Sequence, residues 1–304
     1  MSISVAVIGE CMLELTRVSG LVADVKNPMA LNYGGDTINT SIYLARNNID
    51  VSYVTGLGDD ITSDWLLEEW QSEGVDCSLV TRMPNSVPGM YMINVADDGE
   101  RSFLYWRKDS PASRLFDSTK LAEELFQSIA SYDYLYLSGI SLAILPVESC
   151  NRLFDLLEKY RRQGGKLVFD GNYRPSLWSS IEAARQVYRR MYQITDIALP
   201  TLEDEELLFG FSSGEEVMQA IRGHGVKEMV VKMGGEGCLA LDGGVVSFVG
   251  AEVVQPIDTT AAGDSFNAGY LAARFNGHSG IESSLAGHRL ASKVIQHRGA
   301  IIPK

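Results

Sequence analysis

The chain has 304 residues, of which 45% are hydrophobic and 21% charged, and its formal net charge is −13. This composition is typical of a globular protein with a core large enough for one or two domains. Such an acidic balance argues against nucleic acid or an anionic membrane as the main partner, because both require clustered Lys and Arg, but it is compatible with a small anionic ligand at a local positive site.

The first ten residues, MSISVAVIGE, predict a core strand and lack the basic segment and cleavage site of a signal peptide. No apolar run approaches the roughly 18 residues that a membrane span needs, so we expect a cytoplasmic protein. The cysteines form no CxxC pair and the four histidines form no HExxH motif, which predicts buried thiols and no protein-built metal site. The cysteines are Cys11, Cys77, Cys150 and Cys238.

Short apolar runs alternate with longer segments of helical period along the chain. We expect strands at residues 3–8, 51–55, 134–137, 167–170, 196–199 and 229–232. We expect helices at about residues 36–48, 61–73, 118–130, 146–163, 181–193, 214–223, 264–276 and 281–297. This alternation predicts an α/β fold with a parallel sheet covered on both faces. Ligands of such sheets bind beyond the carboxyl ends of the strands.

Two regions, 11–33 and 88–108, depart from this pattern. In the second, two β-rich runs flank Asp97-Asp98-Gly99, which is a strong hairpin signal. Because strand side chains alternate, Arg101, Phe103, Tyr105 and Arg107 should share one face. We interpret the two regions as a small β lid inserted into one interrupted domain that spans residues 1–304.

The segment YGGDTINT, residues 33–40, follows the first of these regions. Gly34 and Gly35 permit close approach of a ligand to the backbone, and Asn39 would face the same entrance from the helix that follows. In isolation, an ordinary turn with an N-cap is the better supported interpretation.

The segment FDGNYRP, residues 169–175, follows an expected core strand, so its polar groups should point into the ligand crevice. Arg174 could form a bidentate pair with a carboxylate or a phosphate. The alternative is a surface loop with a solvated arginine.

The segment VKMGGEG, residues 231–237, predicts a strand followed by a glycine-rich turn that could pass under a nucleotide. A simple hairpin is the preferred interpretation when the segment is taken alone.

The segment DTTAAGDSFNAGY, residues 258–270, places small residues directly before an acid and a helical run after it. Such a turn can present backbone N–H groups to an anion, with a carboxylate beside them, which suits phosphoryl transfer. A helix capped by Asp264 explains the segment about equally well. The chain contains neither GxxxxGK[ST] nor GxGxxG, so a bound nucleotide would need this other device for its phosphates.

The order and spacing of these segments together resemble the PfkB-type (ribokinase-like) carbohydrate kinases. The resemblance implies a ribokinase-like three-layer α/β/α sandwich with a small β lid formed by insertions. Several segments are similar, more narrowly, to bacterial 2-keto-3-deoxygluconate (2-dehydro-3-deoxygluconate, KDG) kinases, which use ATP to phosphorylate the sugar acid at O6. These segments are VIGECMLE (7–14), GGDTIN (34–39), YLYLSGISLAIL (134–145), NYRP (172–175) and VIQHRGAIIP (294–303).

The resemblance implies roles for the matching residues. Asp264 would accept the O6 proton, while Ala261, Ala262 and Gly263 would form the anion hole that also contacts the nucleotide. The implied substrate residues are Gly34, Gly35, Asn39, Tyr91, Tyr105, Arg107, Arg174, Asp258 and Asp264. The implied nucleotide residues are Asn172, Lys232, Gly234, Gly235 and Gly237. The implied cofactors are ATP and Mg²⁺, with a monovalent cation as a further candidate. Separately, the exposed strand edges of the lid could pair between subunits, so we expect a homo-oligomer joined through the lid.

The residues themselves favour an acidic substrate. Arg107 on the expected lid and Arg174 on the body would supply two cations for a carboxylate, which a neutral sugar would not need. Two alternatives stay open: a related kinase for fructose or another sugar acid, and a non-catalytic sugar-acid sensor.

Two positions depart from the pattern of the family. The usual Asn-x-x-Glu segment aligns with Thr201-Leu-Glu-Asp204, and Glu203 or Glu205 could replace Asp204 in its role. Ala261 stands where many relatives have glycine, and must adopt a backbone conformation accessible to a residue with a Cβ.

Overall fold

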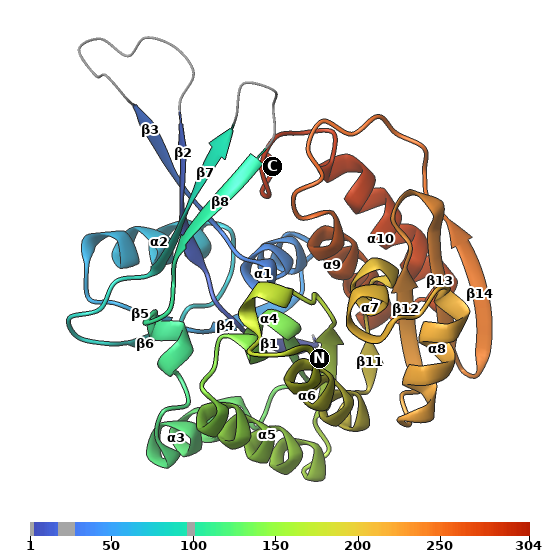
Figure 1. The fold of residues 1–304 in the computed structure, drawn as a ribbon, viewed down its shortest axis with the longest axis horizontal. Helices are drawn as coiled ribbons and strands as arrows, with labels where there is room; N and C mark the ends of the chain where they lie inside the picture. The colour runs from blue at the N-terminus through green and yellow to red at the C-terminus, as the bar shows by residue number, and fades with distance from the viewer. Residues whose placement is uncertain (1–2, 18–27, 96–100) are drawn as a thin grey trace.

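The computed structural model describes residues 3–17, 28–95 and 101–304, and its centre is an eight-stranded sheet built from these residues (Figure 1). The strand order is β14-β13-β12-β11-β10-β9-β1-β4. The strands are β1 (Ser4–Ile8), β4 (Asp50–Val54), β9 (Tyr134–Ser138), β10 (Lys166–Asp170), β11 (Ile197–Ala198), β12 (Glu228–Lys232), β13 (Gly237–Asp242) and β14 (Val245–Gly250).

The six strands from β4 to β12 are parallel, as the apolar runs predicted. β13 is antiparallel to β12, as the hairpin interpretation of residues 231–237 requires, and β14 extends this edge in antiparallel fashion. Four of the six residues of β14 are exposed, so this edge strand is not covered on both faces as the parallel strands are.

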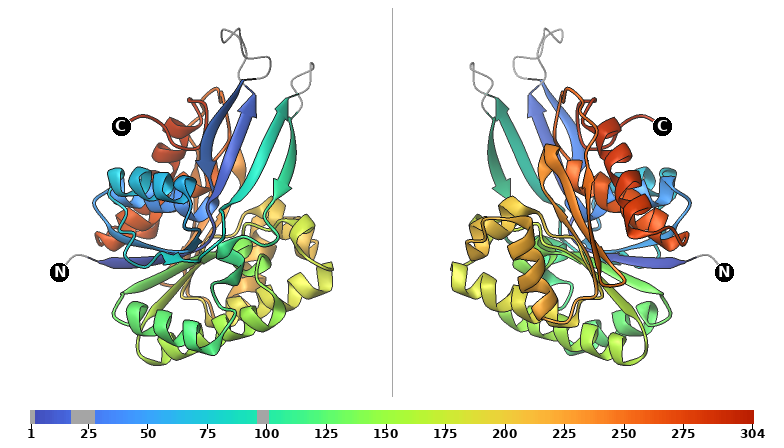
Figure 2. Two further views of the ribbon diagram at one scale, coloured as in Figure 1. Left: turned by 90° about the vertical axis from the view of Figure 1, so that its left-hand side faces the viewer. Right: turned by 90° about the vertical axis from the view of Figure 1, so that its right-hand side faces the viewer.

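Two layers of helices cover the sheet (Figure 2). Within β1, Val5 and Val7 face one layer and Ala6 and Ile8 face the other, because side chains alternate along a strand. The first layer contains α1 (Asp36–Arg46), α2 (Ile61–Ser72), α9 (Ala262–Phe275) and α10 (Gly280–Val294). The second contains α3 (Thr119–Ile129), α5 (Val147–Arg162), α6 (Ile181–Ile194) and α8 (Gly214–Gly223).

All eight expected helices are present in the structure. Several short elements were not predicted from the sequence. Five or eight residues are too few to establish a helical period, and an acidic run obscures the first turn of α7. The missed elements are α4 (Gly139–Ala143), α7 (Leu202–Phe209), the paired strands β5 (Gly56–Leu57) and β6 (Thr81–Arg82), the edge strand β14, and the 3-10 turns η1 (Pro111–Arg114), η2 (Pro175–Leu177) and η3 (Gly234–Glu236).

A second, small sheet rises from one side of the body, as both views in Figure 2 show. Its order is β3-β2-β7-β8, with bounds β2 (Met12–Arg17), β3 (Met29–Gly34), β7 (Gly89–Val95) and β8 (Arg101–Trp106). The strands come from the two regions that departed from the α/β pattern. The expected turn at Asp97-Asp98-Gly99 lies outside the described residues, as do residues 18–27 and the side chain of Arg101.

The two faces of the small sheet differ. The rings of Tyr91, Phe103 and Tyr105 pack together on the face that lines a pocket, with Phe103 and Tyr105 stacked and Tyr91 tilted against both. Leu31, Leu104 and Trp106 belong to the opposite face and are 42%, 50% and 54% exposed. The sheet therefore presents aromatic side chains inward and an apolar surface outward.

In the described part of the chain, no helix is long and apolar enough to cross a membrane. The four cysteines are all free thiols; Cys11, Cys150 and Cys238 are buried and Cys77 is partly buried.

Candidate active site

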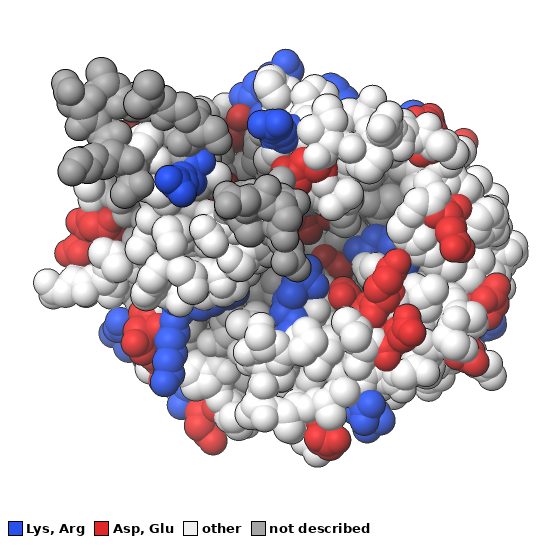
Figure 3. Space-filling model, turned by 45° about the horizontal axis from the view of Figure 1, so that its top comes forward, with Lys and Arg blue, Asp and Glu red and all other residues white. Residues whose placement is uncertain are grey.

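A pocket of about 990 Å³ opens between the small sheet and the carboxyl ends of the body strands. Figure 3 shows this hollow with acidic and basic side chains around its mouth. Every residue that the sequence suggested for the site lines it except Asp258. The Asp258 side chain instead accepts hydrogen bonds from the Thr260 and Gly299 backbone N–H groups, at 3.1 Å each, and so braces the adjoining loops.

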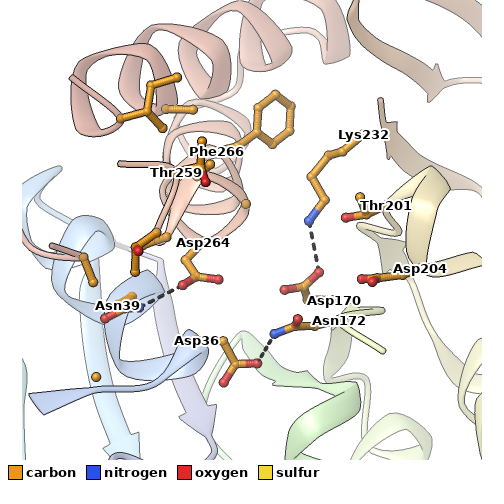
Figure 4. Close-up of a pocket in the computed structure, with 18 of the residues that line it drawn as sticks. Asp36, Asn39, Asp170, Asn172, Thr201, Asp204, Lys232, Thr259, Asp264 and Phe266 are labelled. Atoms are coloured by element: carbon orange, nitrogen blue, oxygen red, sulfur yellow. Dashed lines mark hydrogen bonds and ion pairs between the residues drawn. The ribbon is translucent and has the colours of Figure 1, made fainter. Parts of the chain in front are cut away.

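Asp264 lies in the first turn of α9, and its side chain points across the pocket toward α1. Asn39 Nδ2 donates to Asp264 Oδ2 at 2.9 Å (Figure 4). The N-cap of α9 is Ala261, which makes no side-chain cap hydrogen bond. The alternative in which Asp264 merely caps the helix is therefore wrong.

The turn before Asp264 is strained at Ala261, whose φ of 59° and ψ of 19° are left-handed. The left-handed region of backbone conformation favours glycine, because a Cβ there approaches a carbonyl oxygen closely, so this conformation of Ala261 is energetically unfavourable. The Ala262 N–H already donates to the Thr259 carbonyl at 3.2 Å. The N–H groups of Gly263 and Asp264 belong to the first helical turn, where no intrahelical acceptor exists, and they are the donors available to an anion.

Burial raises the pKa of Asp264 to about 7, and the nearby Asp36 carboxylate adds to the rise. The Asn39 hydrogen bond acts in the opposite direction, as does Lys232. A carboxylate with a pKa near neutrality is suited to general base catalysis, because it is both sufficiently ionised and sufficiently basic.

Asp36, Asp170 and Asp264 point toward the same space in Figure 4. Asn172 Nδ2 donates to Asp36 at 2.6 Å, and Lys232 Nζ lies 3.0 Å from both Asp170 Oδ1 and Asn267 Oδ1. The sequence analysis did not assign Asp36 or Asp170 to the site. Asp170 belongs to the segment 169–175, whose polar groups were expected to face the ligand crevice. The only signal for Asp36 was an acid at the start of a helix, where acids are common as caps.

The segment that departs from the family pattern contributes Thr201, Glu203 and Asp204 to the pocket. Glu205 points away from it: the side chain is buried and accepts a hydrogen bond from Tyr192. Burial raises the pKa of Glu205 to about 8. Of the two expected substitutes for Asp204, the geometry therefore excludes Glu205.

The pocket carries an excess of negative charge on its body side. Burial raises the pKa of Asp204, the Arg174 guanidinium lowers it, and the Asp170 carboxylate raises it again. Oxygen ligands of this kind suit Mg²⁺, with Asp204 and Glu203 as the carboxylates that would hold it, mostly through water. The described residues contain no group of three or more His, Cys, Asp or Glu side chains that could hold a metal without other ligands.

Both arginines line the pocket, and each has an acidic partner. Arg107 lies just past the end of β8 and donates to the buried Glu10. Arg174 is half exposed, and its Nη1 lies 3.5 Å from Asp204 Oδ1. Tyr91 lies on β7, the strand that pairs with β8, and donates its hydroxyl proton to Glu14.

The glycine-rich turn after β12 joins it to the antiparallel β13, so the segment is a hairpin that also lines the pocket. Gly237 has a φ of 130°, and a Cβ there would lie 2.2 Å from the Val249 carbonyl oxygen. Only glycine fits this position.

Comparison with known proteins places these observations in context. The model of the pfkB family carbohydrate kinases matches residues 2–304. The chain is 48% identical to a 2-dehydro-3-deoxygluconokinase of Escherichia coli K12, with 100% of this chain and 98% of that protein covered.

Solved structures give the same picture of the fold. A PfkB protein from Polaromonas sp. JS666 has a TM-score of 0.85 at 26% identity and covers 97% of this chain and 96% of its own. A ribokinase II candidate from E. coli, solved with ATP and Mg²⁺, has a TM-score of 0.84 at 21% identity, with 99% and 94% covered. The α/β fold of the ribokinase-like type is thereby confirmed.

Proposed function

The chain belongs to the pfkB family of carbohydrate kinases, and we propose that its pocket transfers the γ-phosphoryl group of ATP to O6 of 2-dehydro-3-deoxy-D-gluconate (KDG). The enzyme is a 2-dehydro-3-deoxygluconokinase, as its full-length similarity to proteins of that name supports. The structural observation that carries the mechanism is Asp264, a partly buried carboxylate with a raised pKa in the first turn of α9.

In the reaction, Asp264 accepts the O6 proton while O6 forms a bond to the γ-phosphorus. The bond between that phosphorus and the β,γ-bridging oxygen breaks, and ADP leaves. Asn39 holds Asp264 through its 2.9 Å hydrogen bond, so the base is oriented before substrate arrives. The Gly263 and Asp264 N–H groups and the dipole of α9 stabilise charge on the transferred phosphoryl group.

The substrate is proposed to lie with its reacting end at Asp264 and its acidic end beneath the small sheet. Gly34, Gly35 and Asn39 hold sugar hydroxyls. Tyr105, Arg107 and Arg174 recognise the carboxylate, and the guanidinium groups of the two arginines donate hydrogen bonds to it.

The resemblance groups Tyr91 with Tyr105, Arg107 and Arg174 as residues that recognise the keto-acid end of the substrate, and we propose a different role for it. Its hydroxyl proton is directed at Glu14, so the phenolic oxygen offers lone pairs to the pocket. A lone pair suits a sugar hydroxyl and repels a carboxylate. We therefore propose that Tyr91 contacts a hydroxyl of the sugar acid and not its carboxylate.

The nucleotide is proposed to lie along Asn172 and the turn from Gly234 to Gly237, with Lys232 toward the phosphates. A Cβ at Gly263 would lie 3.6 Å from Lys232 Nζ, so the lysine adjoins the anion-binding turn. Mg²⁺, when bound, would neutralise phosphate charge. A monovalent cation is a further proposed cofactor, testable by the K⁺ dependence of turnover, and the cytoplasm is the proposed location.

The small sheet is proposed to act as a lid that excludes water from the transferred phosphoryl group. Its apolar outer face, with Leu31, Leu104 and Trp106 exposed, is the surface proposed to join subunits of a homo-oligomer. We treat the whole chain as one kinase unit with this lid inserted.

The proposal is tested by coupled detection of ADP with a panel of acceptors. We expect strong turnover with KDG, weaker turnover with other sugar acids and little with fructose. A kinase for another sugar would prefer that sugar, and a sensor would bind KDG with no KDG-dependent ADP.

A further inference from the structure

Glu10 is a buried carboxylate at the point where the chain leaves the body for the small sheet. It lies between β1 and β2 and is 3% exposed. Arg107 and Ser110, which follow β8 on the way back to the body, donate to its two carboxylate oxygens. Burial raises the pKa of Glu10, while Arg107 and Ser110 favour its charged form. One side chain therefore joins the first and last connections between the two parts.

The two remaining connections also touch Glu10. A Cβ on Gly35, directly after β3, would lie 2.3 Å from the Glu10 carbonyl oxygen. A Cβ on Gly89, at the start of β7, would lie 3.1 Å from Glu10 Oε1. Glu10 therefore lies in one of the four connections between the body and the small sheet and adjoins the other three. The close approach at Gly35 requires glycine, and a Cβ at Gly89 would be a tight fit.

Although Glu10 holds one end of the Arg107 guanidinium, another of its N–H groups lacks a hydrogen-bond acceptor in the described part of the chain. The Arg107 side chain is 13% exposed and lines the pocket beside Tyr105. Its Nε is buried and has no hydrogen-bond partner among the described residues. A buried N–H of a charged group is costly when unpaired, so the site is built for an acceptor that the chain itself does not supply.

We propose that Glu10 is a positioning residue for substrate recognition: it fixes the Arg107 guanidinium so that its unpaired edge meets the carboxylate of the sugar acid. The inference rests on the proposed function, because it takes a sugar acid as the substrate. Glu10 neutralises much of the Arg107 charge, so Arg107 contributes geometry, and the half-exposed Arg174 contributes the attracting charge.

The test compares Glu10→Ala and Glu10→Gln, alone and combined with Arg107→Ala, for the KM values of KDG and ATP, kcat and Tm. In wild-type Arg107, Glu10→Ala should raise the KM for KDG about tenfold or more and leave the KM for ATP within about twofold. Glu10→Gln keeps an acceptor for Arg107 and should restore most of the loss. In the Arg107→Ala background, Glu10→Ala should add little, because the group it positions is already gone.

A merely structural role gives a different result. Glu10→Ala would then lower kcat/KM by the same factor in both backgrounds, would raise both KM values together, and would not be rescued by glutamine; this pattern overturns the inference. If Glu10→Ala does not fold, Ser110→Ala provides the test, because it loosens Glu10 and leaves the Arg107 charge paired. It should raise the KM for KDG about threefold or more, and an unchanged value overturns the inference.

The wild-type enzyme separates the two proposals. Absence of KDG-dependent ADP formation in the wild type would refute the proposed function whatever Glu10 does. KDG turnover in the wild type with no effect of the Glu10 and Ser110 variants would refute only the positioning role.

Discussion

The side-chain amide of Asn39 lies 2.9 Å from Oδ2 of Asp264, and this hydrogen bond joins the beginning of α1 to the beginning of α9. The two residues are separated by 225 positions in the sequence. Because Oδ2 accepts from Asn39, we expect Oδ1 to take the substrate proton. The contact thus fixes which side of the carboxylate performs the chemistry.

Asp264→Asn should abolish most turnover while leaving the fold intact. Asparagine can still accept from Asn39 but cannot take up the O6 proton, so we expect kcat to fall by about 10²- to 10⁴-fold. The KM for ATP should change little, and circular dichroism should match the wild type. Asp258→Asn is the matched control, because Asp258 does not itself line the pocket and asparagine keeps one of its two acceptor oxygens. A near-normal kcat for Asp264→Asn would show that another group is the base.

The pH dependence of kcat/KM for KDG should report the ionisation of Asp264. The base works only when deprotonated, so the rate should rise with pH and reach half its plateau near pH 7, the raised pKa of this carboxyl. Asp36→Asn removes a negative charge that contributes to the rise, and should move the midpoint to lower pH. If the midpoint of the pH profile is the same in Asp36→Asn and in the wild type, the electrostatic coupling of the two carboxyl groups is contradicted.

The same pKa predicts that Asp264 reduces stability at neutral pH. Its pKa is about 7 in the folded protein, against 3.8 for an unperturbed aspartate such as that of the unfolded chain. Between these values the unfolded chain binds fewer protons, so this group's contribution to stability falls as pH rises and stays low above pH 7. Asp264→Asn should therefore raise Tm more at pH 8 than at pH 5, each taken relative to the wild type. Scanning calorimetry at the two pH values measures this, and equal shifts would contradict it.

The sequence was most informative where one local pattern determines the structure. The parallel strands are buried on both faces, and their apolar runs stand out for that reason. The glycine-rich and small-residue turns lie at strand ends or helix starts, where ligands of α/β proteins bind, so most pocket residues could be named.

Contacts between distant segments could not be predicted in this way. The sequence around Glu10 does not predict its contact with Arg107, which lies 97 positions away. Nor does the sequence show that the side chains of Asp36, Asp170 and Asp264 point toward the same space. An acid beside a helix start has a sufficient local explanation as a cap, so its partner becomes visible only when the fold is known. The edge strand β14 was missed because four of its six residues are exposed to solvent.

Ala261→Gly should stabilise the protein slightly. Ala261 has a φ of 59°, where a Cβ costs about 1–2 kcal/mol. Glycine removes that strain but gains about 0.4–1 kcal/mol of freedom when unfolded, so the net gain should be about 0.5 kcal/mol. Equilibrium urea unfolding measures the difference.

Gly263→Ala is the comparison for this variant. Gly263 is not left-handed, and a Cβ there would lie 3.6 Å from Lys232 Nζ, so the fold should tolerate alanine. The added methyl group should narrow the phosphate site and lower kcat. For Ala261→Gly itself, a lower free energy of unfolding than that of the wild type would show that the turn is not strained.

Leu104→Asp should break the proposed subunit interface. Leu104 is 50% exposed on the outer face of the small sheet, away from the pocket-lining Tyr105. A carboxylate there would have to be desolvated in a joined pair of lids, which opposes association. Light scattering after size exclusion should show an oligomer for the wild type and a monomer for the variant. Val245→Asp, at a 66% exposed position on the edge strand β14, should leave the mass unchanged. A monomeric wild type, or an oligomer that survives Leu104→Asp, would refute the lid interface without affecting the catalytic assignment.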